Sequence, residues 1–357
     1  MEKPKLNKKG SVLPYRAPIT DVSNDYISPS TNTVYQELED FSISGRKRPW
    51  KEKKSNSCLI SDGYDRLSNL IPNSRDYFQN KADRISNCGT WLEFHSFDDG
   101  TKNLHRAFFC KQRLCAVCNW RRSLKIFSQV TKIMDGIQAE NDYEYLFLTL
   151  TVKNVDGPLL YDTVSDLISG YLKLIRKTIV KRSVLGAFRA IEITYNRKSN
   201  QFHPHIHVVL CVKKDYFKNY YIKNQLWSEL WKDCMNLDYN PVIDVRKTYG
   251  DKTKSVAEVA KYATKDEDLM KRDENGNKIA DEEVIFILDE ALRGRRLISY
   301  SGIFKDYQQK LKLQDPEDGD LIHIDDEVIR PDLKYIVETY SWRCGTYSRI
   351  DNINKTA

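Results

Sequence analysis

The sequence predicts an α+β fold, namely a ferredoxin-like (split βαβ) antiparallel sheet with helices on one face, plus a small Cys-rich zinc-binding segment. The first observation is the order of the expected elements between residues 145 and 246, which is strand, helix, strand, strand, helix, strand. The second is the alternation of side chains over residues 205–211, which favours a strand with one face on a core. The third is a group of cysteines spaced C-x4-C-x2-C over residues 110–118, a common zinc geometry.

Each expected element follows from its own sequence pattern. Residues 145–152 give the strongest strand signal because they are rich in Leu, Phe, Thr and Val. Gly157 and Pro158 end that strand, and apolar residues then recur at helical spacing. The other expected strands lie at residues 188–195, 204–211 and 242–246, with a hairpin loop at 196–201, and the helices lie at 119–137, 159–182, 215–236 and 255–265.

The composition indicates a globular protein with some tail, since 40% of residues are apolar and 30% are charged. We expect no membrane span, because there is no apolar run of about 18 residues. The N-terminal residues are polar and show no secretory signal, so we expect a cytoplasmic protein. In that compartment the eight cysteines are expected to be thiols or metal ligands and not disulfides.

The cysteine group predicts a structural Zn²⁺ site. Cys110, Cys115 and Cys118 lie a short turn apart, which lets their thiolates take tetrahedral corners. Cys88 is the natural fourth ligand, with His95 and His105 as fallbacks. The alternative is a set of reduced cysteines buried in a core.

Positive charge is concentrated around these cysteines. Residues 102–125 contain seven Lys or Arg and no Asp or Glu, whereas residues 306–332 contain nine acidic residues and three Lys or Arg. A polyanion such as DNA would therefore meet the first region. The side chains suited to phosphate contacts are Lys111, Arg113, Arg121 and Arg122, and the alternative is a solvated basic face.

Two histidines and a glutamate form a candidate catalytic metal site. His205 and His207 would share one face of their strand. Glu192 lies between two isoleucines on the strand expected to pair with it, and a carboxylate there needs a partner. Two imidazoles and one carboxylate would hold Mn²⁺ or Mg²⁺. His203 is a neighbour and not a ligand, and the alternatives are solvated histidines and an exposed strand glutamate.

The last expected helix carries a second group of reactive side chains. Glu258, Tyr262 and Lys265 fall at i, i+4 and i+7 and would face one way. Tyr262 would be a nucleophile, and Lys261 or Lys265 would stabilise the charge of a phenolate or a phosphate. Two alternatives compete, because Ser255 and Glu258 form an S-x-x-E capping box and Tyr262 would also suit a rim position.

Several motifs in one order resemble the replication initiators of rolling-circle plasmids in the HUH endonuclease superfamily. The resemblance covers residues 88–268, about half of the chain. The motifs are His-Ile-His at 205–207, Glu-Val-Ala-Lys-Tyr at 258–262, Phe-Leu-Thr-Leu-Thr at 147–151, Glu-Ile-Thr-Tyr-Asn at 192–196, and the Cys-rich stretch at 109–123.

This resemblance implies roles for the site residues. His205, His207 and Glu192 would bind the metal, Tyr262 would attack DNA, and Glu258 would replace the second tyrosine of some relatives. The implied substrate is plasmid origin DNA in single-stranded or hairpin form, and the implied partners are a host helicase and DNA polymerase. A homo-oligomer is compatible with the pattern. The alternatives are a single-tyrosine transposase or relaxase, and a non-catalytic zinc-containing DNA-binding regulator.

The sequence suggests four regions. Residues 1–80 are expected to be flexible, and residues 81–125 to form the Cys-rich zinc-binding segment. Residues 126–270 would be the HUH nuclease domain. Residues 271–357 form a C-terminal region of unknown role, in which the apolar stretches 284–288 and 336–342 are expected to pack onto the body.

Overall fold

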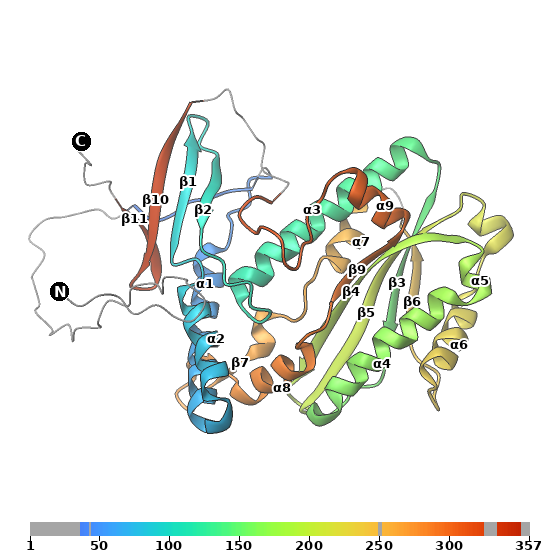
Figure 1. Cartoon of the computed structure of the whole chain (residues 1–357), viewed down its shortest axis with the longest axis horizontal. Helices are drawn as coiled ribbons and strands as arrows, with labels where there is room; N and C mark the ends of the chain where they lie inside the picture. The colour runs from blue at the N-terminus through green and yellow to red at the C-terminus, as the bar shows by residue number, and fades with distance from the viewer. Residues whose placement is uncertain (1–35, 43, 249–251, 325–333, 351–357) are drawn as a thin grey trace, which may run out of the picture. The chain divides into compact units, whose positions relative to one another are not determined.

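A five-stranded antiparallel sheet positions the candidate site in the computed structural model, which describes residues 36–42, 44–248, 252–324 and 334–350. Its strand order is β6-β3-β5-β4-β9, so the chain returns to insert β5 between β3 and β4 (Figure 1). The predicted strands at residues 145–152, 188–195, 204–211 and 242–246 are confirmed, and β9 is an addition. The bounds are β3 (Glu144–Thr151), β4 (Val184–Asn196), β5 (Gln201–Val212), β6 (Ile243–Lys247) and β9 (Ile298–Gly302).

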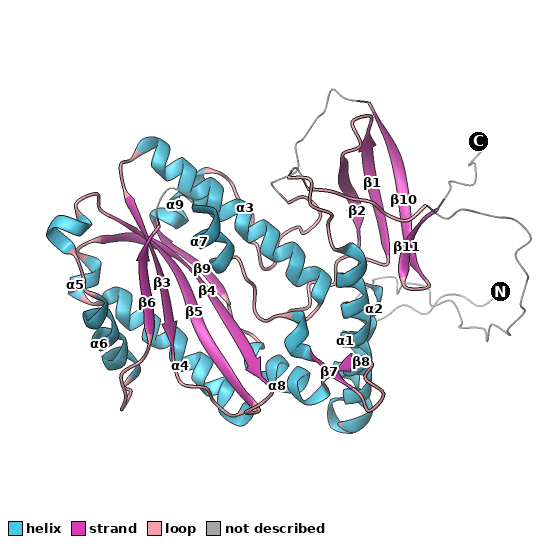
Figure 2. Cartoon of the chain, turned by 180° about the vertical axis from the view of Figure 1, so that it is seen from behind, coloured by secondary structure: helices cyan, strands magenta, loops and turns pink. Residues whose placement is uncertain are grey.

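Helices cover both faces of this sheet, which corrects the expectation of helices on one face only (Figures 1 and 2). On one face the guanidinium of Arg189 lies over the ring of Tyr171 in α4. On the other face Phe188 packs against Tyr300, whose hydroxyl donates to Gln129 of α3. The first group contains α4 (Gly157–Arg176) and α6 (Asn224–Met235), and the second contains α3 (Ala116–Glu140), α7 (Lys252–Val259) and α9 (Ile303–Lys310).

Two long N-terminal helices occupy part of the region expected to be flexible. These are α1 (Trp50–Leu70) and α2 (Arg75–Asn87), joined by a short 3-10 turn at Pro72–Ser74. The prediction of a flexible region over residues 1–80 is therefore wrong for residues 50–80, and its part over residues 1–35 lies outside the described residues. The helix was hard to recognise because its buried face includes polar side chains such as Lys54, Asn56 and Ser57, which interrupt the apolar periodicity.

A second antiparallel sheet joins the beginning and the end of the described chain. Its order is β11-β10-β1-β2, and the C-terminal strand β10 pairs along the whole of β1. The expected packing of residues 336–342 onto the body is thus confirmed, and the predicted boundaries at residues 81 and 271 do not separate independent parts. The bounds are β1 (Trp91–Phe97), β2 (Lys102–Ala107), β10 (Tyr335–Arg343) and β11 (Thr346–Ile350).

The remaining elements connect these layers. The helix expected at residues 215–236 is divided into a π-turn at Tyr216–Tyr220 and α6, and the helix expected at 159–182 ends at Arg176 before α5. Helix α8 packs against α1, where Ile285 lies over Gly63. These elements are α5 (Thr178–Lys181), a 3-10 turn at Asp266–Leu269, β7 (Met270–Arg272), β8 (Lys278–Ala280) and α8 (Glu282–Leu292).

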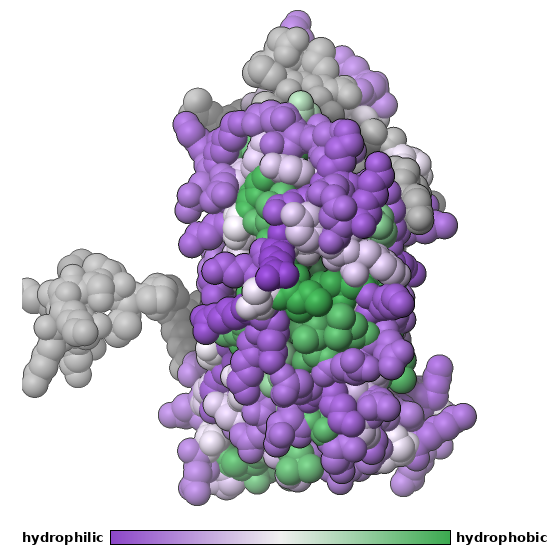
Figure 3. Space-filling model, turned by 90° about the vertical axis from the view of Figure 1, so that its right-hand side faces the viewer, coloured by the Kyte–Doolittle hydropathy of each residue, from purple (hydrophilic) through white to green (hydrophobic). Residues whose placement is uncertain are grey.

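The surface is mainly hydrophilic. The side on which α5 and α6 lie carries a central patch of apolar side chains within a hydrophilic border (Figure 3). Among the described residues, no helix combines the length and apolar character needed to cross a membrane.

Candidate active site

The two histidines and the glutamate predicted as metal ligands meet on one face of the five-stranded sheet. Backbone pairing of β4 with β5 places Glu192 opposite His205 and Ala190 opposite His207. Oε2 of Glu192 lies 3.1 Å from Nε2 of His205 and 3.0 Å from Nε2 of His207. All three side chains are buried, and their donor atoms are close enough to share one metal ion.

Further contacts fix how the imidazoles face the carboxylate. Nδ1 of His205 lies 3.1 Å from the backbone carbonyl oxygen of His203, and this acceptor assigns the ring proton to Nδ1. Nε2 of a neutral His205 then points a lone pair at Oε2 of Glu192. Two acceptors at this distance repel each other unless a proton or a metal cation lies between them. His203 thus takes part through its backbone, as a neighbour of the site.

His207 has an equivalent support on the adjacent strand. Its Nδ1 lies 3.2 Å from the hydroxyl of Thr149, and β3 pairs Thr149 directly with His207. Metal-binding histidines usually carry such a bond on their second ring nitrogen, because it fixes the tautomer and the ring orientation. The donor set and its supports therefore fit a divalent cation.

Glu192 is held in its ionised form. Burial acts to raise the pKa of this carboxyl, but with a proton on Nε2 of each imidazole the hydrogen bonds and charge of His205 and His207 outweigh burial and hold the pKa well below its usual range. A carboxylate that stays charged in a buried position is a ready ligand for a cation.

The segment that carries Tyr262 is not helical. Helix α7 ends at Val259, and Ala263 adopts a left-handed backbone conformation with φ of 57°. The carbonyl of Ala263 accepts a hydrogen bond from the backbone N–H of Ile193 at 2.8 Å, which ties the segment to the edge of β4 beside Glu192. The predicted helix over residues 255–265 is therefore wrong beyond residue 259.

This geometry also changes the predicted relation between Glu258 and Tyr262, which do not lie one helical turn apart. Glu258 is partly exposed and its Oε2 accepts a bond from Nζ of Lys261 at 2.5 Å. The capping-box alternative is wrong, since α7 begins at Lys252 and Ser255 lies inside it.

The hydroxyl of Tyr262 is buried and bonded. It donates to Oε1 of Glu317 at 3.0 Å, and the guanidinium of Arg122 lies 5.1 Å from the centre of its ring. Burial raises the pKa of the phenol well above its usual value; Arg122 opposes this shift and Glu317 adds to it. Tyr262 is thus held as a neutral phenol.

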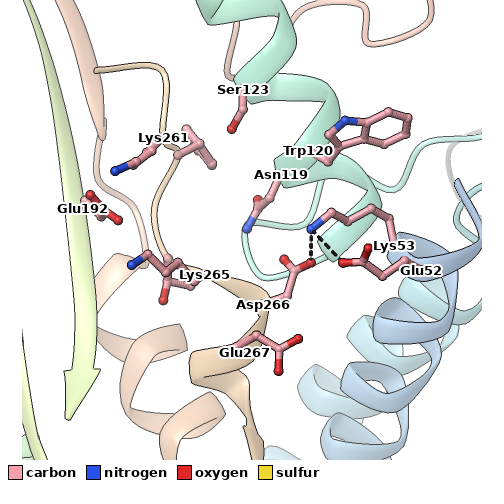
Figure 4. A pocket seen from close by; sticks show the side chains of 12 residues that line it. Glu52, Lys53, Asn119, Trp120, Ser123, Glu192, Lys261, Lys265, Asp266 and Glu267 are labelled. Atoms are coloured by element: carbon pink, nitrogen blue, oxygen red, sulfur yellow. Dashed lines mark hydrogen bonds and ion pairs between the residues drawn. The ribbon is translucent and has the colours of Figure 1, made fainter. Parts of the chain in front are cut away.

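A cavity of about 410 Å³ brings the two groups together, because Glu192 and Tyr262 both line it. Lys261 and Lys265 lie on the same side of the cavity as Glu192 (Figure 4). The remaining lining residues come from α1, α3 and the stretch after Tyr262: Glu52, Lys53, Asn119, Trp120, Ser123, Thr264, Asp266 and Glu267.

The four predicted cysteines converge in a second cluster. Sγ of Cys118 lies 3.5 Å from Sγ of Cys88 and 3.7 Å from Sγ of Cys110, and Cys115 completes the group. A tetrahedral zinc with Zn–S bonds of about 2.3 Å would separate its sulfurs by about 3.8 Å, so the spacing fits. The fallback ligands His95 and His105 instead stack on each other in the β1–β2 hairpin.

Hydrogen bonds to these sulfurs favour thiolates. The backbone N–H of Cys110 donates to Cys88, and that of Lys111 donates to Cys118. Ser57 of α1 accepts from the N–H of Val117, and its hydroxyl oxygen lies 3.4 Å from Sγ of Cys115, within reach of a further hydrogen bond. No sequence pattern indicates a role for Ser57, because the polar side chains on the buried face of α1 conceal the helix.

Two of the arginines predicted to contact DNA are buried. Arg121 donates to the carbonyls of Leu321 and Ile322, and Arg122 donates to the carbonyl of Glu317. These guanidinium groups hold the segment at residues 314–322 against α3, so the structure corrects their prediction as phosphate contacts. The acidic composition of residues 306–332 was the only hint of this packing.

The other two predicted cations differ in exposure. Nζ of Lys111 is exposed and bonds to the carbonyl of Asp318, while the partly buried Arg113 bonds to the carbonyl of Leu292. Only Lys111 of the four therefore presents its charge largely to solvent.

Fold and site together define an α+β protein with two candidate metal clusters, one of them next to a buried tyrosine. A family model described as "Replication protein" (Rep_1) matches residues 101–349. The chain belongs to this replication protein family, which confirms the predicted resemblance to plasmid rolling-circle initiators.

Individual relatives align over most of their length. "Protein rep" of Bacillus amyloliquefaciens is 40% identical over 318 residues, which cover 84% of this chain and 92% of that protein. "Protein rep" of Streptococcus pneumoniae serotype 2 (strain D39 / NCTC 7466) is 34% identical over 297 residues, or 81% and 88% of the two chains. "Replication protein" of Staphylococcus aureus is 37% identical over 227 residues, or 60% and 94%. No solved structure gives a significant match.

Proposed function

We propose that this protein initiates rolling-circle replication by nicking one strand of a plasmid double-strand origin and rejoining the DNA at termination. The observation that carries the proposal is the convergence of His205, His207 and Glu192 beside a cavity that Tyr262 also lines. Membership of the replication protein family supports it. The protein would thus be a metal-dependent DNA endonuclease and strand transferase.

The three ligands would hold one Mn²⁺ or Mg²⁺ ion. Their buried lone pairs and the hydrogen bonds on the outer nitrogens of both histidines suit such an ion. When bound, the ion would polarise the scissile phosphate. The Cys88, Cys110, Cys115 and Cys118 cluster would hold a structural Zn²⁺ and fix the start of α3.

Tyr262 would carry the nick. Its phenolic oxygen attacks phosphorus as its proton passes to a water molecule, a P–O bond forms, and the bond from phosphorus to the 3′-oxygen breaks. The 3′-oxygen takes up a proton from water, which leaves a free 3′-hydroxyl and a 5′-phosphotyrosine. Since Glu317 holds the Tyr262 hydroxyl, that hydrogen bond must open before attack.

The neighbouring charges would serve the same reaction. Lys265 lines the cavity and would neutralise charge on the phosphate, while Lys261 pairs with Glu258. At termination Glu258 would activate water or a DNA hydroxyl, which requires its release from Lys261. Glu258→Ala should therefore nick normally and retain the covalent DNA.

The substrate would be single-stranded or extruded hairpin DNA, because a duplex hides its backbone from a sheet face. The strand order β6-β3-β5-β4 is the basis for interpreting the nuclease core as ferredoxin-like. A helicase would open the duplex and a polymerase would extend the 3′-hydroxyl.

The deciding experiment uses Tyr262→Phe. The unmodified protein, an origin oligonucleotide and Mn²⁺ should give an adduct that survives denaturing electrophoresis, and Tyr262→Phe should give none. Tyr221→Phe is the matched control, since this exposed tyrosine lies outside the cavity, and it should react normally. An adduct formed by Tyr262→Phe would refute the assignment, and DNA binding without any adduct would favour a non-catalytic regulator.

A further inference from the structure

One wall of the cavity has no part in the proposed nick. It is formed by Asn119, Trp120 and Ser123, which lie in the first turns of α3. Asn119 and Ser123 project from this helix toward the side that carries Glu192 and Lys265 (Figure 4). A substrate strand with its phosphate near Glu192 would therefore bring its adjacent atoms to this wall.

Two buried polar groups that line the cavity lack hydrogen-bond partners among the described residues. The Nδ2 amide of Asn119 has none, although its Oδ1 accepts from Arg122 at 3.4 Å. The hydroxyl of Thr264 also has none. Asn119 is 5% exposed and Thr264 is 6% exposed. A buried polar group without a partner costs free energy, so both atoms would gain from a polar ligand.

Trp120 adds an aromatic surface to the same wall. Its ring meets that of Trp50 edge-on, with centroids 4.7 Å apart and planes at 90°. This packing fixes the ring while part of the side chain lines the cavity. Tryptophan is a common stacking partner for unpaired bases.

The charges around this wall favour a neutral group over a second phosphate. Lys53 is paired with Asp266 at 2.6 Å and lies 3.8 Å from Glu52 (Figure 4). Glu267 is paired with Lys278 at 2.7 Å. Because Lys53 is already paired and several carboxylates lie nearby, this wall would attract a phosphate only weakly. A nucleobase carries no charge, so the same carboxylates do not repel it.

We infer that the cavity binds one unpaired nucleobase of the origin strand, adjacent to the scissile phosphate. The base would stack on Trp120 and accept a hydrogen bond from Nδ2 of Asn119, while the Thr264 hydroxyl meets a second polar atom. This inference rests on the proposed function, which identifies the bound strand as the nicked origin strand. It assigns the choice of base at one position of that strand to Asn119, Trp120 and Thr264.

The test measures binding without cleavage. Full-length Tyr262→Phe protein is titrated with origin-strand oligonucleotides that carry an abasic site at each position flanking the nick. At one of these positions the abasic site should weaken binding about tenfold, which is the usual effect of losing one stacked base. We call this loss of affinity the abasic penalty, and the position the sensitive position. In a Trp120→Leu background that penalty should disappear, because the base no longer has its stacking partner.

Two variants control for folding. Trp120→Phe keeps an aromatic face and should retain the abasic penalty. Trp91→Leu removes an exposed tryptophan on β1 and should leave the penalty unchanged. If Trp120→Leu still shows the full loss of affinity for the oligonucleotide that is abasic at the sensitive position, the inference is overturned.

Asn119→Leu tests the hydrogen bond. It removes the donor at similar volume and adds no charge, so the base preference at the sensitive position should be lost while affinity for the abasic oligonucleotide stays the same. An unchanged preference would overturn the role of Asn119. Adduct formation by the unmodified protein is measured separately. If adducts form but no abasic position depends on Trp120, only the base pocket is refuted. If a position depends on Trp120 but no adduct forms, only the nicking reaction is refuted.

Discussion

Tyr262 and Glu317 are joined by a buried hydrogen bond, with the tyrosine hydroxyl donating to Oε1 of the carboxylate at 3.0 Å. Glu317 is itself fixed, because Oε1 also accepts from the backbone N–H of Leu297 and Oε2 lies 3.5 Å from Nε of Arg296. A carboxylate in this position stabilises the protonated phenol and opposes the phenolate. The described conformation is therefore one in which the proposed nucleophile is restrained.

Removing the charge of Glu317 should release this restraint. Glu317→Gln keeps an acceptor for Tyr262 and Leu297 but weakens a charge-assisted bond, so adduct formation in a single turnover should rise about tenfold. Asp318→Asn changes an exposed neighbouring carboxylate and should have no effect. A slower reaction with Glu317→Gln would mean instead that the carboxylate assists the attack.

The segment at residues 314–322 should depend on Arg121 for its position. Arg121→Ala leaves the carbonyls of Leu321 and Ile322 without their donor, so the free energy of unfolding should fall by about 2–4 kcal/mol. Arg106→Ala, on an exposed arginine, should change it by less than about 0.5 kcal/mol. Urea unfolding measures both. A normally stable Arg121→Ala protein with weakened, less salt-dependent DNA binding would restore the phosphate role.

The convergence of the three candidate metal ligands was predictable because strand pairing has a fixed period. Alternation places His205 and His207 on one face, and a hairpin of short loop length brings Glu192 opposite His205. Cysteine spacing likewise predicted three of the sulfurs. These features depend on local geometry that a sequence pattern reveals directly.

The surroundings of Tyr262 were not predictable in this way. Helical periodicity continues through Ala263, so nothing local signals that α7 ends at Val259 or that Ala263 has a positive φ. Glu317 approaches Tyr262 across 55 residues, and only tertiary packing creates that contact. The strand β9 was missed because its residues, Ile-Ser-Tyr-Ser-Gly, show a weak strand pattern.

The cysteine cluster should bind zinc in about a one-to-one ratio to the chain, as a four-thiolate site does. Cys110→Ser should lose the metal and lower the thermal unfolding midpoint, because the cluster joins the end of α2 to the start of α3. Cys344→Ser, on an exposed cysteine, should retain both metal and stability. Elemental analysis and calorimetry give the two readouts, and a metal-free native protein would exclude the zinc site.

Thr149 should set the metal affinity of the catalytic site through His207. Thr149→Val removes the hydroxyl next to Nδ1 with little change in volume, and loss of such a supporting bond typically weakens metal binding about 10-fold to 100-fold. Thr163→Val, at a partly exposed position on α4 away from the site, is the control and should bind normally. Mn²⁺ binding followed by electron paramagnetic resonance measures affinity without reference to DNA cleavage. Equal Mn²⁺ affinities for the two variants would show that Thr149 does not orient His207, whereas a selective loss in Thr149→Val would tie the outer hydrogen bond to the metal site.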